Sequence, residues 1–343
     1  MENSVQAELL FNRLAKRYRH LKKWARRTGT NSFRLYDRDI PEIPLVLDFY
    51  GDAVSGALYR PGEKDEDVTD LKSAEAWLSD MKAAVSRALD IPESSIFLKE
   101  RRRMRRRQEE GNQYGRIARR NFYRDVREGA LLFRVNLSDY LDTGLFLDAR
   151  KKRALIRSGA AGKRVLNLFA YTCSLSVAAA KGGAARIDSV DLSATYLEWG
   201  RINFALNGLE AGYPPLTDKL PANGTITLIR SDVMQFIGRA AKSSLRWDII
   251  ILDPPSFSNS KRMKGALALA RDHHDLIKRS LSLLSPGGTL WFSSNAKGVK
   301  IDAGDFPGLD VKDYGKELTD EDFRGKRIPS CYALSAATTS VSQ

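Results

Sequence analysis

The spacing of apolar residues divides the chain into stretches that predict different elements. In residues 5–28, apolar side chains recur at every third or fourth position, which predicts an amphipathic helix that Gly29 ends. Residues 73–89 repeat this spacing and predict a second helix. Short apolar stretches bounded by proline and glycine turns predict strands at residues 33–36, 45–50, 54–59, 95–99 and 130–136. We therefore expect a basic helix at residues 1–30 and a small α+β domain at residues 31–150.

From residue 151 to residue 343, apolar strands alternate with helical stretches, which predicts a separate α/β domain. The expected strands are residues 165–169, a strand that ends at Asp191, and residues 226–229, 247–252 and 290–292. Residues 311–317 and 330–336 can add a closing hairpin. Strands that alternate with helices favour a mostly parallel sheet with helices on its faces. The predicted fold class is α/β, a Rossmann-like doubly wound sheet with a smaller N-terminal α+β domain.

The strand at residues 247–252 runs into a rigid acidic turn, Asp253-Pro254-Pro255-Ser256-Phe257. Residues 249–252 are all apolar, as in a strand buried on both faces, and the prolines prevent a helix from following. Ligands of open α/β sheets bind at the carboxyl ends of the strands. Asp253 can accept hydrogen bonds from N–H groups, and Phe257 can stack on a base. We expect catalytic roles for Asp253, Pro254, Pro255 and Phe257, although a strand that merely ends in a turn has the same pattern.

Two other predicted strands also end in polar residues. Residues 170–174 form a loop of mostly small residues before a helix, and backbone N–H groups at a helix start favour a negative or polar group. Asp191 ends the next strand about twenty residues later, where an acidic residue accepts the hydroxyls of a bound ribose. Asp232 follows the third strand. We expect these groups to form one ligand site at the edge of the sheet.

The charge of the chain indicates a polyanionic partner. Lys and Arg number 56 against 42 Asp and Glu, so the formal net charge is +14. Eight cations lie within residues 13–27 and seven within residues 99–107. These clusters could face solvent, and the first could face a membrane surface, but the scarcity of acids in both favours RNA. The expected RNA contacts in them are Arg13, Lys16, Arg17, Lys22, Lys23, Arg101, Arg102, Arg103, Arg105, Arg106 and Arg107.

The cysteines and histidines suggest neither a disulfide framework nor a zinc site. The chain has 2 cysteines, Cys173 and Cys331, and 3 histidines with no cysteine close by, so we expect no metal. The first thirty residues contain no continuous apolar segment of the kind found in signal peptides or membrane spans. We therefore expect a cytoplasmic protein without a membrane partner.

The second half of the chain resembles the class I methyltransferases, which use S-adenosylmethionine. The matching phrases are Asn167-Leu-Phe-Ala-Tyr-Thr-Cys-Ser174, Val190-Asp-Leu-Ser193, Ser231-Asp232 and Asp253-Pro-Pro-Ser-Phe257. The resemblance implies that Asp191 binds the ribose and that Asp232 binds the adenine amino group. The implied cofactor contacts are Asn167, Phe169, Ala170, Tyr171, Thr172, Ser174, Asp191, Leu192, Ser193, Asp232, Val233 and Asp253.

The whole chain is similar to a narrower family, the C-terminal halves of the bacterial bifunctional large-subunit rRNA methyltransferases, which form N7-methylguanosine in 23S rRNA. The matching phrases are Asn12-Arg-Leu14, Arg34-Leu-Tyr-Asp37, Asn112-Gln-Tyr114, Asp139-Tyr-Leu-Asp-Thr-Gly-Leu-Phe-Leu-Asp148, Thr195-Tyr-Leu-Glu-Trp199, Phe257-Ser-Asn-Ser-Lys-Arg262 and Arg271-Asp-His273. This likeness implies that Phe146 and Asp148 line the cofactor pocket. We also expect Lys261 and Arg262 to contact RNA.

This chain differs from that family at two points. Family members usually carry Gly where Cys173 stands, so we expect the loop to lie slightly farther from the carboxylate of the cofactor. The other half of the bifunctional protein, which methylates a different guanine, has no counterpart in this sequence, so we expect no second activity.

The chemistry favours guanine over cytosine as the methylated base. Methylation of carbon 5 of cytosine requires a cysteine adduct at carbon 6. Relatives with that activity carry a cysteine where this chain has Ser293-Ser294-Asn295, and we expect neither Cys173 nor Cys331 to be placed as a nucleophile. Guanine N7 already has an in-plane lone pair and needs alignment rather than a base. A carboxylate, for which we propose Asp253, would favour the positive charge that develops on the purine.

Two alternatives to guanine N7 methylation stay open from the sequence. The turn at residues 253–257 resembles the turn by which amino-methylating enzymes hold an exocyclic nitrogen, which would give methylation at guanine N2. A noncatalytic RNA-binding protein could retain the same fold. A Rossmann-like oxidoreductase is disfavoured because Gly-x-Gly-x-x-Gly is missing after Phe169. The sequence leaves open the target nucleotide, the oligomeric state, and whether free 23S rRNA or an assembly precursor of the large subunit is the substrate.

Overall fold

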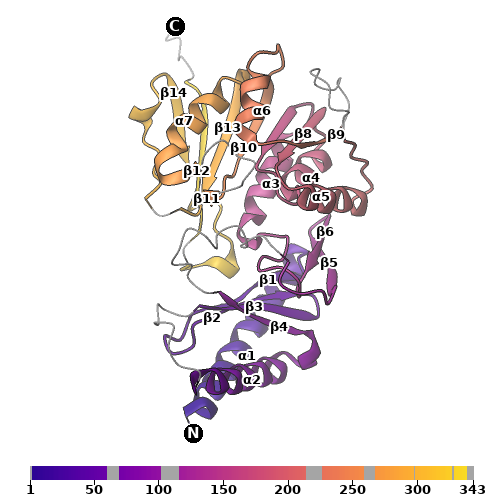
Figure 1. The fold of residues 1–343 in the computed structure, drawn as a ribbon, viewed down its shortest axis with the longest axis vertical. Helices are drawn as coiled ribbons and strands as arrows, with labels where there is room; N and C mark the ends of the chain where they lie inside the picture. The colour runs from indigo at the N-terminus through magenta and orange to yellow at the C-terminus, as the bar shows by residue number, and fades with distance from the viewer. Residues whose placement is uncertain are drawn as a thin grey trace. The chain divides into compact units, whose positions relative to one another are not determined.

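The computed structural model describes residues 2–59, 69–101, 116–213, 226–258, 267–296, 298–326 and 328–337. The chain forms two compact units (Figure 1). Unit 1 comprises Met1–Leu147 and Glu321–Lys326, and unit 2 comprises Asp148–Asp320 and Arg327–Gln343. The last segment of unit 1 therefore comes from within the sequence of unit 2.

Unit 1 contains a four-stranded sheet and two long helices. The strands are β1 (Ser32–Asp37), β2 (Leu45–Tyr50), β3 (Ala53–Tyr59) and β4 (Ile96–Arg101), in that order across the sheet. The first three are antiparallel to one another, whereas β4 lies parallel to β3. The helices are α1 (Glu2–Thr28) and α2 (Thr69–Leu89), and the short 3-10 turn η1 (Glu93–Ser95) precedes β4. These elements confirm the helices and strands predicted for this part of the chain.

The core of unit 1 lies where α1 and α2 meet the sheet. Leu10, Leu14 and Leu21 of α1 are buried, as the helical spacing predicts, and Gly29 follows the helix with φ of +70°. The core also takes residues from α2 and from alternate positions of the strands, because successive strand residues point to opposite faces. The apolar face of α1 is therefore part of the unit 1 core, and its charged face remains toward solvent.

A separate hairpin joins the sheet of unit 1 to the segment that leads into unit 2. It consists of β5 (Tyr123–Glu128) and β6 (Leu131–Asn136), which pair antiparallel. After β6, the fully buried Asp139 accepts hydrogen bonds from the Arg116 guanidinium, the Ser138 hydroxyl and the Arg120 backbone N–H. These donors outweigh burial and hold the pKa of Asp139 well below its usual value. This network fixes the chain just before the 3-10 turn η3 (Leu147–Ala149).

Unit 2 is built on a seven-stranded sheet with the order β14-β15-β13-β10-β7-β8-β9. The strands are β7 (Arg164–Leu168), β8 (Arg186–Asp191), β9 (Ile226–Arg230), β10 (Trp247–Leu252), β13 (Leu284–Ser294), β14 (Leu309–Asp313) and β15 (Ser330–Ala336). The helices are α3 (Arg150–Gly159), α4 (Ser174–Lys181), α5 (Ala194–Leu206), α6 (Val233–Ala240) and α7 (Leu269–Leu281). Strands β9, β8, β7, β10 and β13 run parallel, and β15 is antiparallel to β13 and to β14.

Strand β10 is covered by helices on both faces. Ile250 and Leu252 belong to one cluster with residues of α6 and α7, whereas Ile249 and Ile251 belong to another with residues of α3 and α4. Alternate residues of a strand point to opposite faces, so an uninterrupted apolar run fits a strand between two helical layers. This confirms the doubly wound α/β fold that the sequence predicts.

The C-terminal part of unit 2 differs in detail from the prediction. Strand β13 begins at Leu284, earlier than the predicted residue 290, because the Pro-Gly-Gly stretch at 286–288 lies within the strand at an irregularity of the pairing. The predicted closing pair is confirmed, with β14 ending at Asp313. The remaining short elements are β11 (Phe257–Ser258), β12 (Leu267–Ala268), η4 (Ala303–Asp305) and η5 (Glu321–Phe323).

A buried polar network crosses the sheet of unit 2. Asp188 of β8 is fully buried, and its two oxygens accept hydrogen bonds from the Arg186 guanidinium, the Thr227 hydroxyl and the Trp247 indole N–H. Arg186 is 2% exposed. A buried charge is tolerated when it is paired and its remaining lone pairs are satisfied, and both conditions hold here.

Among the helices in the described ranges, none is both long and apolar enough to cross a membrane.

Candidate functional site

The carboxyl ends of β7 and β10 lie side by side at the centre of the unit 2 sheet. Leu168 and Leu252 are register partners on these adjacent parallel strands, so Phe169 and Asp253 follow them at one edge. Strand β7 continues to β8 on one side and borders β10 on the other. From β7 the chain continues to β8 and β9 on one side of the sheet, whereas from β10 it continues to β13 on the other side. Open α/β sheets bind ligands at the point where the strand order reverses in this way.

The loop after β7 has three left-handed residues in alternation. Phe169, Tyr171 and Cys173 have φ values of +59°, +51° and +60°. This conformation usually falls to glycine, because a Cβ crowds the backbone there and costs roughly 1–2 kcal/mol per residue. The Tyr171 N–H donates to Asp191, and the Asn203 side chain of α5 donates to the Thr172 carbonyl. These contacts hold the loop in a glycine-like path although it contains no glycine.

Cys173 packs its side chain against α5. Its side chain is fully buried, and its Sγ lies against Gly200 of α5. Burial raises the pKa of the Cys173 thiol, so it stays protonated and is a poor nucleophile. The prediction that Cys173 moves the loop away from the cofactor carboxylate stays a prediction.

Asp191 at the end of β8 retains the capacity to bind hydroxyl groups. Its Oδ2 accepts from Tyr171 N at 2.9 Å and its Oδ1 from Ser193 N at 2.8 Å. Burial raises the pKa of Asp191 to about 6, and the backbone N–H groups of Ser193, Tyr171 and Leu192 oppose the rise. The two carboxylate oxygens have about four lone-pair sites between them, so beside these three N–H groups the carboxylate can accept a further hydrogen bond. The geometry fits a hydroxyl donor such as that of a ribose.

Several other predicted cofactor contacts are buried. Asn167, Thr172 and Val233 are each 3% exposed or less. The Asn167 amide donates to Ser176 Oγ on α4, and its buried Oδ1 has no hydrogen-bond partner among the described residues. Asp232 caps α6, with Oδ1 accepting from Gln235 N at 2.9 Å. Such a cap is a structural role that leaves Oδ2 available, and the adenine contact of Asp232 stays a prediction.

A lysine that the sequence analysis missed lies on the Asp253 turn. The Lys152 ammonium of α3 donates to Asp253 Oδ2 and to Ser293 Oγ of β13, each at 2.7 Å. Its side chain is 7% exposed, against 34% for Asp253. Burial disfavours the ammonium, but the nearby carboxylates outweigh burial and raise the pKa of Lys152. The signal was present in the helical spacing, because Lys152 lies four residues before the buried Ile156 and so shares its face.

Cys331 lies nearer to this cluster than the sequence suggests. It pairs with Ser293 across β13 and β15, and the charges of Lys152 and Asp253 act on it. Burial raises the pKa of the Cys331 thiol to about 11. A protonated buried thiol is not an activated nucleophile, so the argument against cytosine methylation does not change.

No group of three His, Cys, Asp or Glu that could hold a metal occurs in the described ranges.

Some predicted site residues are not placed in the unit 2 site. Phe146 lies in unit 1 and is 45% exposed, whereas Asp148 begins unit 2 and contributes to the raised pKa of Lys152. Pro254 is buried and Pro255 is partly exposed. The side chains of Phe257 and Arg101 lie outside the described part of the chain. So do the residues Arg102, Arg103, Arg105, Arg106, Arg107, Lys261 and Arg262.

The predicted RNA contacts on α1 divide into two groups. Arg13 pairs with Asp39 at 2.8 Å, and Arg17 donates to the Leu35 carbonyl at 2.7 Å and lies 3.8 Å from Asp39. These two arginines stabilise unit 1. The remaining predicted contacts on α1 are exposed to solvent: Lys16, Lys22 and Lys23. Among these five predicted contacts, Lys16, Lys22 and Lys23 can approach phosphates without breaking an internal ion pair.

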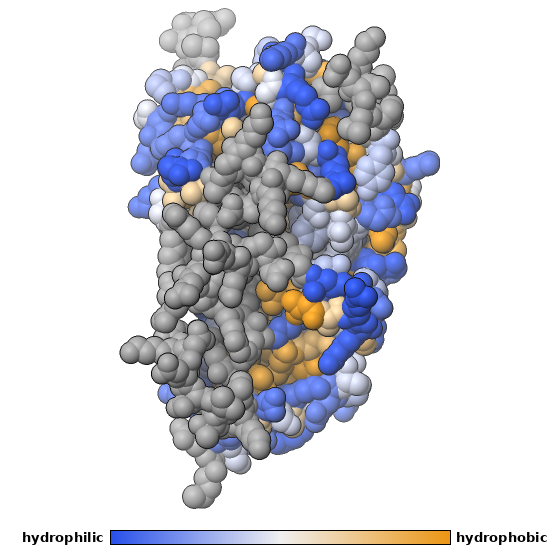
Figure 2. Space-filling model, in the orientation of Figure 1, coloured by the Kyte–Doolittle hydropathy of each residue, from blue (hydrophilic) through white to orange (hydrophobic). Residues whose placement is uncertain are grey.

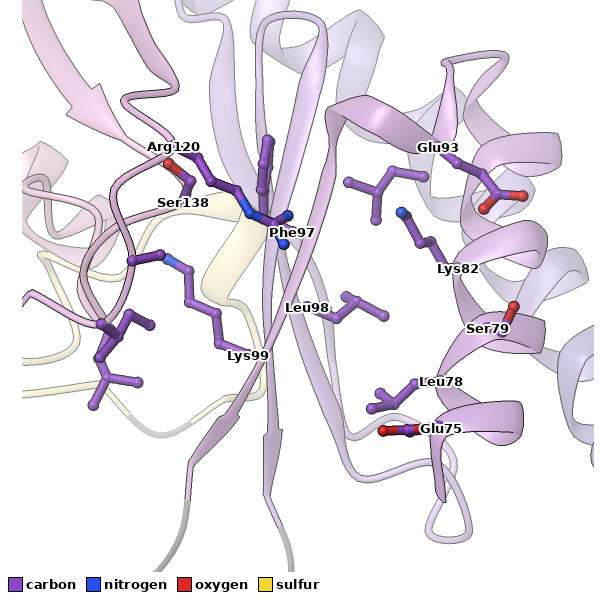
Figure 3. A pocket seen from close by; sticks show the side chains of 14 residues that line it. Glu75, Leu78, Ser79, Lys82, Glu93, Phe97, Leu98, Lys99, Arg120 and Ser138 are labelled. Carbon is purple, nitrogen blue, oxygen red and sulfur yellow. The ribbon is translucent and has the colours of Figure 1, made fainter. Parts of the chain in front are cut away.

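Unit 1 also has a hollow of about 620 Å³ beside β4. Figure 3 shows Leu78 and Lys82 on α2 and Phe97 and Leu98 on β4, and Arg120 also lines it. Figure 2 shows apolar surface at the level of β4 in Figure 1. The charged residues of the lining are Lys82, Lys99 and Arg120 together with Glu75 and Glu93. Apolar side chains next to cations can accept a stacked base and its phosphate.

Comparison with known proteins identifies relatives over most of the chain. Residues 121–304 match a family model described as S-adenosylmethionine-dependent methyltransferase. The chain is 41% identical over 329 residues to Ribosomal RNA large subunit methyltransferase K of Neisseria meningitidis serogroup B, covering 94% of this chain and 86% of that protein. It is also 41% identical over 334 residues to Ribosomal RNA large subunit methyltransferase K/L of Allochromatium vinosum. That match covers 97% of this chain but only 43% of the relative, so the chain spans less than half of the K/L protein.

Solved structures show the same fold. A putative methyltransferase crystallised in complex with SAH matches with a TM-score of 0.69 at 24% identity, covering 96% of this chain and 81% of that one. A putative SAM-dependent methyltransferase from Streptococcus mutans matches with a TM-score of 0.68 at 23% identity and the same coverage.

Proposed function

The chain belongs to the S-adenosylmethionine-dependent methyltransferase family, and from this membership we propose that it methylates N7 of a guanine in 23S rRNA of the large ribosomal subunit. The observation that carries the proposal is the 41% identity, over 94% of this chain, to a protein named Ribosomal RNA large subunit methyltransferase K. The choice of N7 rests on the resemblance described from the sequence and on the chemistry of the site.

The ends of β7, β8 and β9 supply groups that suit the cofactor. S-adenosylmethionine, when bound, supplies a methyl group on a positively charged sulfur. The Asp191 carboxylate would accept the ribose hydroxyls, and Asp232 would accept the adenine amino group. The loop at residues 169–173 would approach the cofactor through its backbone, because the Cys173 and Thr172 side chains are buried. The free lone-pair site of Asp191 is the structural feature that supports this placement.

Guanine N7 needs little from the protein beyond alignment. Its lone pair lies in the plane of the base, the new N–C bond forms there, and no proton has to leave. The chain must therefore hold the base in line with the methyl group and exclude water. We assign the orienting contact to Asp253, at the end of β10 and beside the cofactor loop.

Methylation of guanine N2 is the second candidate, since the turn at Asp253 resembles that of amino-methylating enzymes. An exocyclic amine must lose a proton, so this reaction needs a proton acceptor. The ammonium of Lys152 already donates to Asp253 Oδ2, so only Oδ1 remains to face the base. The choice of N7 over N2 rests on the resemblance of the whole chain described from the sequence.

Unit 1 would hold the RNA. The supporting features are the exposed lysines of α1 and the hollow beside β4, which apolar side chains, three cations and two glutamates line. Reaching a guanine within folded rRNA would require the base to be extruded, and Phe257 is our candidate to stack on it.

Methyl transfer to purified rRNA tests the proposal. The protein is incubated with S-adenosylmethionine and 23S rRNA, or with large-subunit precursors, and the digested nucleosides are identified by mass spectrometry. We expect N7-methylguanosine. N2-methylguanosine would replace the N7 assignment with the second candidate, and a methylated cytosine or adenine would overturn both. Cofactor binding without any methylated product would favour the noncatalytic RNA-binding alternative.

A further inference from the structure

Lys152 is the residue of α3 that ties the Asp253 turn to a different strand of the sheet. Its ammonium lies 2.7 Å from Asp253 Oδ2 after β10 and 2.7 Å from Ser293 Oγ on β13. Three elements, α3, β10 and β13, therefore converge on one nitrogen atom. An ammonium has three N–H donors, and two of them are directed at these oxygens.

The burial of Lys152 makes this contact more than a surface ion pair. Exposed pairs contribute little because both side chains move freely in water. Here the lysine is 7% exposed, so its charge depends on the partners around it. Asp253 is 34% exposed, so the carboxylate is held from one side and open on the other.

We propose that Lys152 is a positioning residue for methyl transfer, which fixes Asp253 as an oriented hydrogen-bond acceptor. This inference rests on the proposed function, because it assigns Asp253 to the guanine. Oδ2 is engaged by the ammonium, so Oδ1 is the oxygen left to receive an N–H group of the base. Lys152 does not itself touch the base, since its nitrogen is enclosed by Asp253 and Ser293.

The arrangement suits a reaction that needs the base held in one orientation. A carboxylate that is paired with an ammonium through one oxygen can still accept a hydrogen bond at the other. With Lys152 in place the turn therefore presents Oδ1 in a fixed direction. Although burial disfavours the ammonium, the nearby Asp253 carboxylate raises the pKa of Lys152, which agrees with an ammonium at this position.

The test is a double-mutant cycle between Lys152→Met and Asp253→Asn, measured as methyl transfer from labelled S-adenosylmethionine into rRNA. We expect Lys152→Met to lower kcat about tenfold or more and to leave the Kd for S-adenosylmethionine within about twofold. Lys152→Arg should restore part of the activity, because a guanidinium can also donate to both oxygens. The matched control is Lys151→Met on the same helix, where the lysine donates to the Thr319 carbonyl and not to Asp253.

The cycle decides whether Lys152 acts through Asp253. If it does, the double variant loses no more activity than the worse of the two single variants. Losses that multiply, or wild-type kcat in Lys152→Met, would overturn the proposal. Thermal unfolding of each variant shows whether unit 2 is folded, and the double variant leaves no unpaired charge at the site. If the wild-type product is another methylated nucleoside, the proposed function fails, yet the cycle still reports whether the two residues are coupled.

Discussion

Gly200 of α5 lies directly against the thiol of Cys173. A Cβ on Gly200 would come within 2.5 Å of the Cys173 Sγ and 3.0 Å of its Cβ. The glycine thus provides the space that the cysteine fills, and the two positions are matched in size. This match is how the cofactor loop takes a cysteine in a left-handed position where a glycine would be less strained.

Gly200→Ala should destabilise unit 2 by about 1–3 kcal/mol, because the added methyl group overlaps a buried thiol. S-adenosylmethionine binding should weaken as well, since the loop must move. The double variant Cys173→Gly with Gly200→Ala should recover stability: the methyl group takes the vacated space, and alanine favours the helix by about 1 kcal/mol over glycine. Denaturant unfolding and calorimetric titration measure both effects. An unfolding midpoint unchanged in Gly200→Ala would contradict the close packing.

Asp191 should make cofactor affinity dependent on pH. In the proposed site the ribose hydroxyls would donate to the ionised carboxylate, and burial raises the pKa of Asp191 to about 6. We expect the association constant for S-adenosylmethionine to be constant above that pH and to fall about tenfold per pH unit below it. Titration calorimetry between pH 5 and pH 8 checks this. Asp191→Asn should bind at least about tenfold more weakly and without this pH dependence.

The same raised pKa affects folding in the opposite direction. The pKa of Asp191 is higher in the folded protein than the ordinary value of 3.8 that we take for the unfolded chain. Such a carboxyl group stabilises the folded state fully when the pH is below 3.8, and this stabilisation is lost as the pH rises through about 6. Comparison of the unfolding free energies of the wild type and Asp191→Asn across this range should show the difference, and parallel curves would refute it.

Asp188→Ala should lower the free energy of unfolding by about 3–5 kcal/mol, because it leaves the Arg186 charge buried without its carboxylate. Urea denaturation measures the change. The matched control is Asp275→Ala on the surface of α7, whose partner is Arg279 and which should cost about 0–1 kcal/mol. Equal costs for the two variants would show that the buried network has no special weight.

The exposed lysines of α1 should contribute to RNA affinity and not to folding. Replacing Lys16, Lys22 and Lys23 by Gln should reduce the slope of log Kd against log salt by about 2, since each phosphate contact on a single strand contributes about 0.7. Filter binding between 50 and 200 mM salt, with thermal unfolding in parallel, measures both properties. Arg17→Gln is the contrasting variant. It removes the hydrogen bond from the Arg17 guanidinium to the Leu35 carbonyl and should therefore lower the unfolding temperature. A salt slope unchanged in the triple variant would assign the lysines to a solvated face.

The sequence predicts best where local pattern and tertiary environment agree. Residues 249–252 form an apolar run that only a strand buried on both faces can use, and the prolines after it fix where the strand ends. The positions of Asp191 and Asp253 at the same edge of the sheet, after the two strands that flank β7, follow from this pattern together with the rule for parallel sheets.

Prediction fails where partners come from distant parts of the chain. Nothing near Lys152 indicates that Asp253 and Ser293, more than a hundred residues later, would be its partners. The left-handed path of Phe169 and Tyr171 is likewise hidden, since neither residue favours it and contacts with other elements impose it. The strand predicted at residues 290–292 is also longer than expected, since β13 begins at Leu284 and continues through Pro286 at an irregularity of the pairing, where proline is tolerated in a strand.

The segment Glu321–Lys326 limits how this protein can be recombined. It is encoded between β14 and β15 of unit 2, yet in unit 1 Asp322 accepts the Arg34 backbone N–H, and the Arg34 guanidinium lies over the Phe323 ring. A gene fragment that begins at Asp148 would carry these six residues away from the surface that receives them. Unit 2 therefore cannot be exchanged between proteins by a single cut in the sequence. If unit 1 is fused to another enzyme, that enzyme must contain an equivalent of residues 321–326.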